Sequence, residues 1–107
     1  MKQMTVTELR DYLATDVAPI LIDVRETHEL QHGILEGAIH IPMQTVPAKM
    51  AEFDQDKTKP VVLICRSGKR SDQVGQYLEQ NGFSDVINLA GGMNAWAAEI
   101  DTSMSVY

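Results

Sequence analysis

The only cysteine of the chain lies among residues that favour an ionised sulfur. Cys65 follows the apolar run Val61-Val62-Leu63-Ile64 and precedes Arg66-Ser67-Gly68-Lys69-Arg70-Ser71. Three of the nine basic residues of the chain therefore lie within five positions after one thiol. Nearby cations and hydrogen-bond donors lower the pKa of a thiol below its usual value of about 8.5. We expect Cys65 to be a nucleophile that faces a binding site for an anion.

The segments on either side of Cys65 place the thiol at a favourable point of the chain. Residues 61–64 are apolar and mostly β-branched, which is typical of a strand buried on both faces. A polar start at Ser71 and an Asn-Gly pair at 81–82 predict a helix over 71–81. Cys65 then lies in the turn before a helix, where free backbone N–H groups and the helix dipole stabilise anions.

The remaining patterns alternate between strands and helices. Thr5 and Glu8 form a capping box at the start of the first expected element, a helix over 5–14. The other expected elements are a strand at 20–22, helical turns at 27–32, a short edge strand at 37–42, a helix at 45–53, a strand at 83–89 and a helix at 93–100. We expect residues 101–107 to fray. This alternation predicts an α/β fold in which helices cover both faces of a parallel sheet.

Length and composition limit the possible functions. The 107 residues predict a single domain over 1–107, and 44% hydrophobic residues fit a globular protein. The net charge of −6 argues against a nucleic-acid partner, and the apolar stretches are too short to span a membrane. One cysteine and three dispersed histidines form no metal-ligand pattern, and no cofactor is expected. The start of the chain lacks a secretory pattern, so we expect a cytoplasmic location.

Four segments, in this order and spacing, resemble the single-domain rhodanese-like sulfurtransferases of the rhodanese/Cdc25 superfamily. They are Asp23-Val24-Arg25-Glu26, Gly33-Ile34 with Glu36 to Pro42, Cys65 to Ser71, and Gly91-Gly92-Met93-Asn94-Ala95-Trp96. The resemblance implies a five-stranded parallel sheet of strand order 1-5-4-2-3. It also implies that Cys65 takes a sulfane sulfur from a small anionic donor such as thiosulfate. The resulting persulfide passes its sulfur to cyanide or to a thiol, including a protein thiol.

The residues after Cys65 are the expected substrate-binding site. They are Arg66, Ser67, Gly68, Lys69, Arg70 and Ser71. Backbone N–H groups of the loop can hold the terminal sulfur, and the cations can attract the donor. Asp23 and Arg25 are expected to support the site as a charge-assisted pair at the end of a strand. The simpler interpretations are an inert buried thiol and a solvated group of charges.

Two other functions remain open at this point. Cysteine-dependent phosphatases and arsenate reductases of the related type have five residues between cysteine and an arginine that clamps an oxyanion. Here Ser71 occupies that position, and Arg70 lies one residue too early. The other alternative is a persulfide carrier or interaction module that hands sulfur to a protein partner. The sequence does not identify the donor, the acceptor or the oligomeric state.

Overall fold

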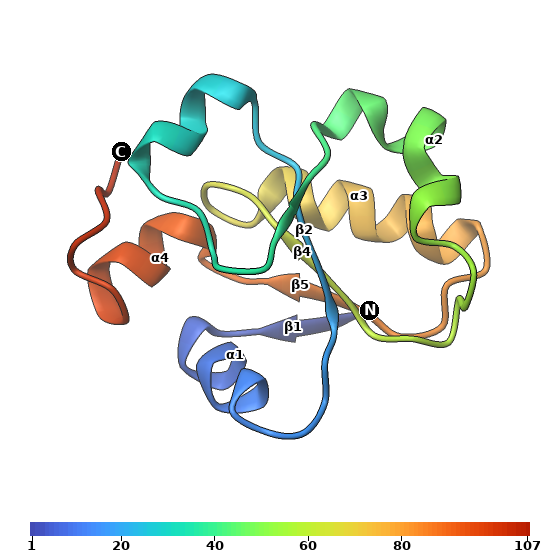
Figure 1. Cartoon of the computed structure of the whole chain (residues 1–107), viewed down its shortest axis with the longest axis horizontal. Helices are drawn as coiled ribbons and strands as arrows, with labels where there is room; N and C mark the ends of the chain where they lie inside the picture. The colour runs from blue at the N-terminus through green and yellow to red at the C-terminus, as the bar shows by residue number, and fades with distance from the viewer.

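A five-stranded parallel sheet lies at the centre of the computed structural model, which describes residues 1–107 (Figure 1). The strands are β1 (Lys2–Met4), β2 (Ile20–Asp23), β3 (Ile39–His40), β4 (Val61–Ile64) and β5 (Val86–Leu89). Their order across the sheet is β1-β5-β4-β2-β3, and every neighbouring pair is parallel. The fold class and strand order predicted above are therefore confirmed.

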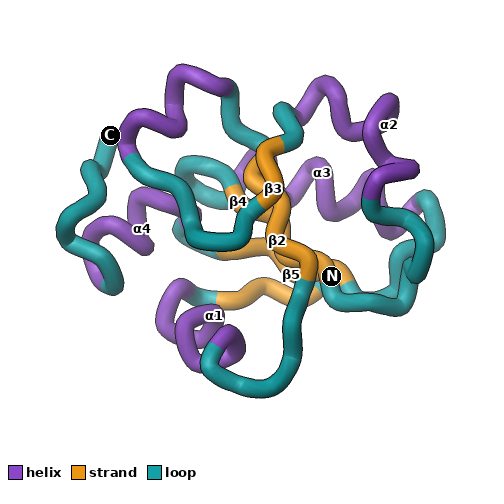
Figure 2. The backbone as a smooth tube through the Cα atoms, in the orientation of Figure 1, coloured by secondary structure: helices purple, strands orange, loops and turns teal.

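Helices cover both faces of this sheet, as Figures 1 and 2 show. The α-helices are α1 (Val6–Leu13), α2 (Val46–Lys49), α3 (Lys69–Gln80) and α4 (Gly92–Glu99). Three 3-10 helices complete the fold: η1 (Thr27–His32), η2 (Met43–Thr45) and η3 (Met50–Glu52). None of these helices has the length and apolar character that a bilayer crossing requires.

The central strand β4 contributes to two separate apolar cores because its side chains alternate between the faces of the sheet. Val61 and Leu63 belong to one core together with residues of α2 and α3. Val62 and Ile64 belong to the other core, with Leu9 of α1 among their neighbours. All four strand residues are fully buried. Burial on both faces explains why this stretch is apolar at every position.

The first element of the chain is a strand, which corrects the prediction that the chain begins with a helix. Residues 2–4 pair with β5 in the register Lys2↔Ile87. The predicted helix follows directly as α1, and its capping box is present. The Thr5 N–H donates to Glu8 Oε1 at 2.9 Å, and the Glu8 N–H donates to Thr5 Oγ1 at 3.2 Å. Three exposed or half-buried residues are too few to show a strand pattern in sequence.

Residues 101–107 pack against the domain, so the expectation that they fray is wrong. The Ser105 N–H donates to the carbonyl of His32 at 3.1 Å. The Tyr107 N–H donates to Asn94 Oδ1 at 2.9 Å, and Asn94 Nδ2 donates to the Tyr107 carbonyl at 2.8 Å. The partners lie far away in the sequence or on another element, which is why no local pattern reveals this segment.

Candidate functional site

The loop between β4 and α3 curls around the sulfur of Cys65. Gly68 is the N-cap residue before α3 and has φ +100°, a left-handed conformation that glycine adopts without strain. Its backbone N–H donates to Cys65 Sγ at 3.1 Å. A Cβ atom at position 68 would lie 3.2 Å from the carbonyl oxygen of Leu89. Glycine at this position therefore permits both the turn and its close approach to β5.

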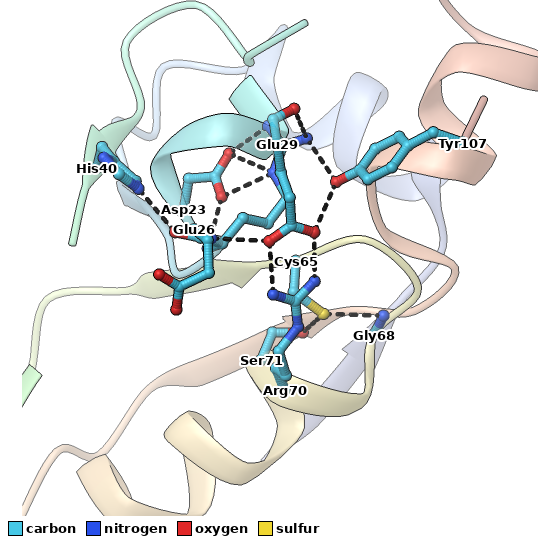
Figure 3. Close-up of polar contacts among 10 residues, drawn as sticks. Asp23, Glu26, Glu29, His40, Cys65, Gly68, Arg70, Ser71 and Tyr107 are labelled. Carbon is cyan, nitrogen blue, oxygen red and sulfur yellow. Dashed lines mark hydrogen bonds and ion pairs between the residues drawn. The ribbon is translucent and has the colours of Figure 1, made fainter. Parts of the chain in front are cut away.

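Hydrogen bonds compensate for the burial of the sulfur. Cys65 is 1% exposed, and its Sγ lies 3.2 Å from Ser71 Oγ (Figure 3). Burial raises the pKa of the Cys65 thiol, whereas the hydroxyl of Ser71 and the N–H groups of Ser71, Gly68 and Ser67 lower it. The net result is a pKa below the ordinary value of a cysteine. The sulfur is thus buried, but the loop amides point at it and favour its ionised form.

The N-terminus of α4 holds the backbone of the same loop. The Met93 N–H donates to the carbonyl of Cys65 at 2.8 Å, and the Asn94 N–H donates to the carbonyl of Arg66 at 3.0 Å. Gly92 has φ +58°, and a Cβ atom there would lie 2.5 Å from backbone atoms of Arg66. The Gly91-Gly92 turn therefore brings the free N–H groups of α4 against the cysteine loop.

The three cations after Cys65 each have a different neighbour. Arg70 makes two hydrogen bonds of 2.7 Å to the carboxylate of Glu29 (Figure 3). The Arg66 guanidinium lies 4.9 Å from the ring centroid of Tyr107. Lys69 lines a polar cleft of about 560 Å³ that borders the loop. Its other lining residues include Gln3, Ser67, Gly68, Gln73 and Gln76.

Glu29 is the most strongly perturbed acid of the site. The two hydrogen bonds from Arg70 hold its pKa at about 2, although burial acts in the opposite direction. The carboxylate also accepts a hydrogen bond from the hydroxyl of Tyr107 at 3.1 Å. Glu29 is 7% exposed, so the pair is shielded on the carboxylate side. Arg70 is therefore occupied by an internal carboxylate.

Asp23 and Arg25 form an ion pair at the end of β2. Arg25 Nη2 lies 2.7 Å from Asp23 Oδ2, and Arg25 Nε lies 3.0 Å from Asp23 Oδ1. Both side chains are fully buried. Arg25 also donates to the carbonyl of Gly33 at 2.8 Å and to the hydroxyl of Tyr107 at 3.0 Å. The pair braces the loop around η1, which carries Glu29.

Three site residues were not predicted from the sequence: Glu29, Asn88 and Tyr107. Asn88 had a visible signal, because it is a polar residue inside the otherwise apolar strand Val86–Leu89. Glu29 and Tyr107 had none, since each contacts the loop from a distant part of the chain. No group of three or more His, Cys, Asp or Glu side chains is arranged to hold a metal ion.

Known proteins of one family resemble this chain over most of its length. Residues 5–99 match the family model described as a rhodanese-like domain. A sulfurtransferase from Allochromatium vinosum is 40% identical over 83% of this chain and 81% of its own. A thiosulfate sulfurtransferase from Coxiella burnetii is 35% identical over 78% of this chain and 77% of its own.

Solved structures show the same likeness at the level of the fold. The crystal structure of a rhodanese-like domain protein from Staphylococcus aureus has a TM-score of 0.84 and 34% identity to this chain. The match covers 100% of this chain and 99% of that one. Sequence relatives, family match and fold thus agree, and the chain belongs to the rhodanese family.

Proposed function

We propose that this protein is a sulfurtransferase that carries a sulfane sulfur on Cys65, with thiosulfate as a donor and cyanide or a thiol as acceptor. The observation that carries the proposal is the set of hydrogen-bond donors around the Cys65 sulfur. The Gly68 N–H lies 3.1 Å from Sγ, and further donors lower the pKa of the thiol despite burial. Sulfurtransferases among the relatives support the reaction class, and the relative named as a thiosulfate sulfurtransferase supports this donor.

The proposed reaction has two displacement steps. The Cys65 thiolate attacks the outer sulfur of thiosulfate, a sulfur–sulfur bond forms, and sulfite leaves with the electron pair of the bond that breaks. The acceptor then attacks the outer sulfur of the persulfide, and the Cys65 thiolate is the leaving group. Loop N–H groups stabilise the charge on the terminal sulfur. Arg66 and Lys69 attract the anionic donor.

Phosphate hydrolysis and arsenate reduction are less well supported as functions of this site. Those reactions need an arginine whose donors are free to clamp a tetrahedral oxyanion. Arg70 has two of its donors bound to Glu29 at 2.7 Å, and it lies one residue closer to the cysteine than that clamp requires. The geometry therefore favours attack on a sulfane sulfur over attack on a phosphate or an arsenate.

The test compares wild type with Cys65→Ser, and with Ser103→Ala as an exposed control. Thiocyanate formation from thiosulfate and cyanide is measured, and intact mass is recorded after thiosulfate alone. We expect wild type and Ser103→Ala to turn over and to gain the mass of one sulfur atom, and Cys65→Ser to do neither. Turnover by Cys65→Ser would refute the proposal. Loading from a protein persulfide but not from thiosulfate would identify a carrier instead.

A further inference from the structure

Ser71 has one hydroxyl proton and two neighbours that can accept it. Its Oγ lies 3.2 Å from Cys65 Sγ and 2.5 Å from Asn88 Oδ1. A serine hydroxyl donates one hydrogen bond at a time. Ser71 is fully buried and Asn88 is 3% exposed. When Ser71 donates to one of these two acceptors, the other needs a different donor. Without one, it is a buried polar group with no hydrogen bond, which is unfavourable.

The orientation of the Asn88 amide is fixed by its other contacts. Its Nδ2 donates to the carbonyl of Gly68 at 3.1 Å and to Gln3 Oε1 at 2.8 Å. A flipped amide would place Oδ1 against the carbonyl oxygen of Gly68. Gln3 is oriented in turn, because its Nε2 donates to the carboxylate of Asp72 at 2.9 Å. Asn88 Oδ1 therefore faces Ser71 and can only accept.

We propose that Asn88 is a positioning residue that holds the proton of Ser71 away from the Cys65 sulfur until the sulfur ionises. While Cys65 is protonated, its S–H donates to Ser71 Oγ, and the Ser71 hydroxyl donates to Asn88 Oδ1. When the sulfur loses its proton to solvent, the hydroxyl of Ser71 turns to the thiolate. Asn88 Oδ1 then loses its donor.

Ionisation of Cys65 thus breaks the buried hydrogen bond between Ser71 and Asn88. This loss raises the pKa of the thiol, whereas the hydrogen-bond donors around the sulfur lower it. Arg70 of α3 is a charged group that interacts with the sulfur, and its own partners are the Glu29 carboxylate of η1 and the uncharged Tyr107 hydroxyl. All three side chains are kept in the variants below. A thiol is most effective in sulfur exchange when its pKa lies near ambient pH, because nucleophilicity falls with pKa. Asn88 therefore keeps Cys65 from becoming a weakly nucleophilic, permanently ionised sulfur.

The inference rests on the proposed role of Cys65 as nucleophile, but its test needs no sulfur donor. Since Cys65 is the only cysteine, the rate of alkylation by iodoacetamide against pH reports its pKa directly. Asn88→Leu keeps the number and branching of the side-chain heavy atoms and leaves the Ser71 hydroxyl free to donate to the thiolate. We expect the pKa of Cys65 to fall by about one unit. Asn88→Ala is the second variant, and Asn81→Ala, at the far end of α3, is the control that should match wild type.

The Ser71→Ala background separates positioning from a general structural effect. If Asn88 acts through Ser71, then Asn88→Leu leaves the pKa of Cys65 unchanged in that background. Circular dichroism establishes which variants are folded. A folded Asn88 variant whose thiol pKa equals or exceeds that of wild type would overturn the inference, as would an equal fall in the Ser71→Ala background. If wild type shows the expected alkylation profile but transfers no sulfur, that result would count against the proposed function alone.

Discussion

Glu29 determines what Arg70 can bind, because its two carboxylate oxygens accept hydrogen bonds from both terminal nitrogens of Arg70. The folded-state pKa of Glu29 is about 2, against an ordinary value of 4.5. A carboxyl whose pKa is depressed by folding stabilises the fold above its unfolded pKa, and this stabilisation is lost as the pH falls toward the folded value. The pair should therefore contribute fully at pH 7 and lose most of its contribution between about pH 4.5 and pH 2.

The Glu29→Gln variant tests the direction of this pH dependence. Because one-third of the Arg70 side chain is exposed, solvent screening reduces the contribution, and we expect the variant to lose about 1–2 kcal/mol of unfolding free energy at pH 7. Urea denaturation should show this difference shrinking as the pH falls to 3. Glu52→Gln, at an exposed position, should match wild type at both pH values. A difference that grows toward low pH would contradict the assignment.

At the scale of elements, the start of α4 fixes the shape of the cysteine loop. A Cβ atom at Gly92 would lie 2.5 Å from the carbonyl oxygens of Arg66 and Cys65, whereas one at Gly37 would meet no atom within 4 Å. Both glycines have positive φ, +58° and +82°. At either site, the left-handed backbone conformation costs an alanine about 1 kcal/mol of free energy relative to glycine.

Gly92→Ala and Gly37→Ala therefore form a matched pair. We expect Gly92→Ala to cost about 2 kcal/mol more unfolding free energy than Gly37→Ala, because backbone atoms must move apart. It should also lower kcat for sulfur transfer, since the carbonyls of Cys65 and Arg66 lose their donors on α4. Denaturation and steady-state kinetics on both variants provide the measurement. Equal effects from the two substitutions would show that α4 does not shape the loop.

The elements that could be predicted from sequence are those whose signals are local. Strand β4 is apolar at every position because both its faces are buried, and α1 carries its own capping box. Strand β1 could not be predicted, since three residues on the sheet edge show no period. Cys65 and its loop could be predicted as a site because their residues are consecutive in the sequence. Glu29 was not, because its partner Arg70 lies 41 residues away.

At the scale of the molecule, residues 101–107 join parts of the site that no single element connects. The Tyr107 hydroxyl accepts from Arg25 at 3.0 Å and donates to Glu29 at 3.1 Å. Its ring stacks on His32, with centroids 4.0 Å apart, and lies beside the guanidinium of Arg66. This one side chain thus contacts the end of β2, the η1 helix and the cysteine loop, so it should add to the stability of the whole domain.

Tyr107→Ala should lower the unfolding free energy by about 2 kcal/mol, because apolar contact and two hydrogen bonds are lost. Tyr107→Phe, which keeps the ring, should lose about 1 kcal/mol. Val106 is 60% exposed, so Val106→Ala should stay within about 0.5 kcal/mol of wild type. Urea unfolding followed by circular dichroism and by the fluorescence of Trp96, the only tryptophan, provides the measurement. If residues 1–107 form one cooperative unit, the two signals coincide in every variant, and a separate early transition in Tyr107→Ala would contradict that unity.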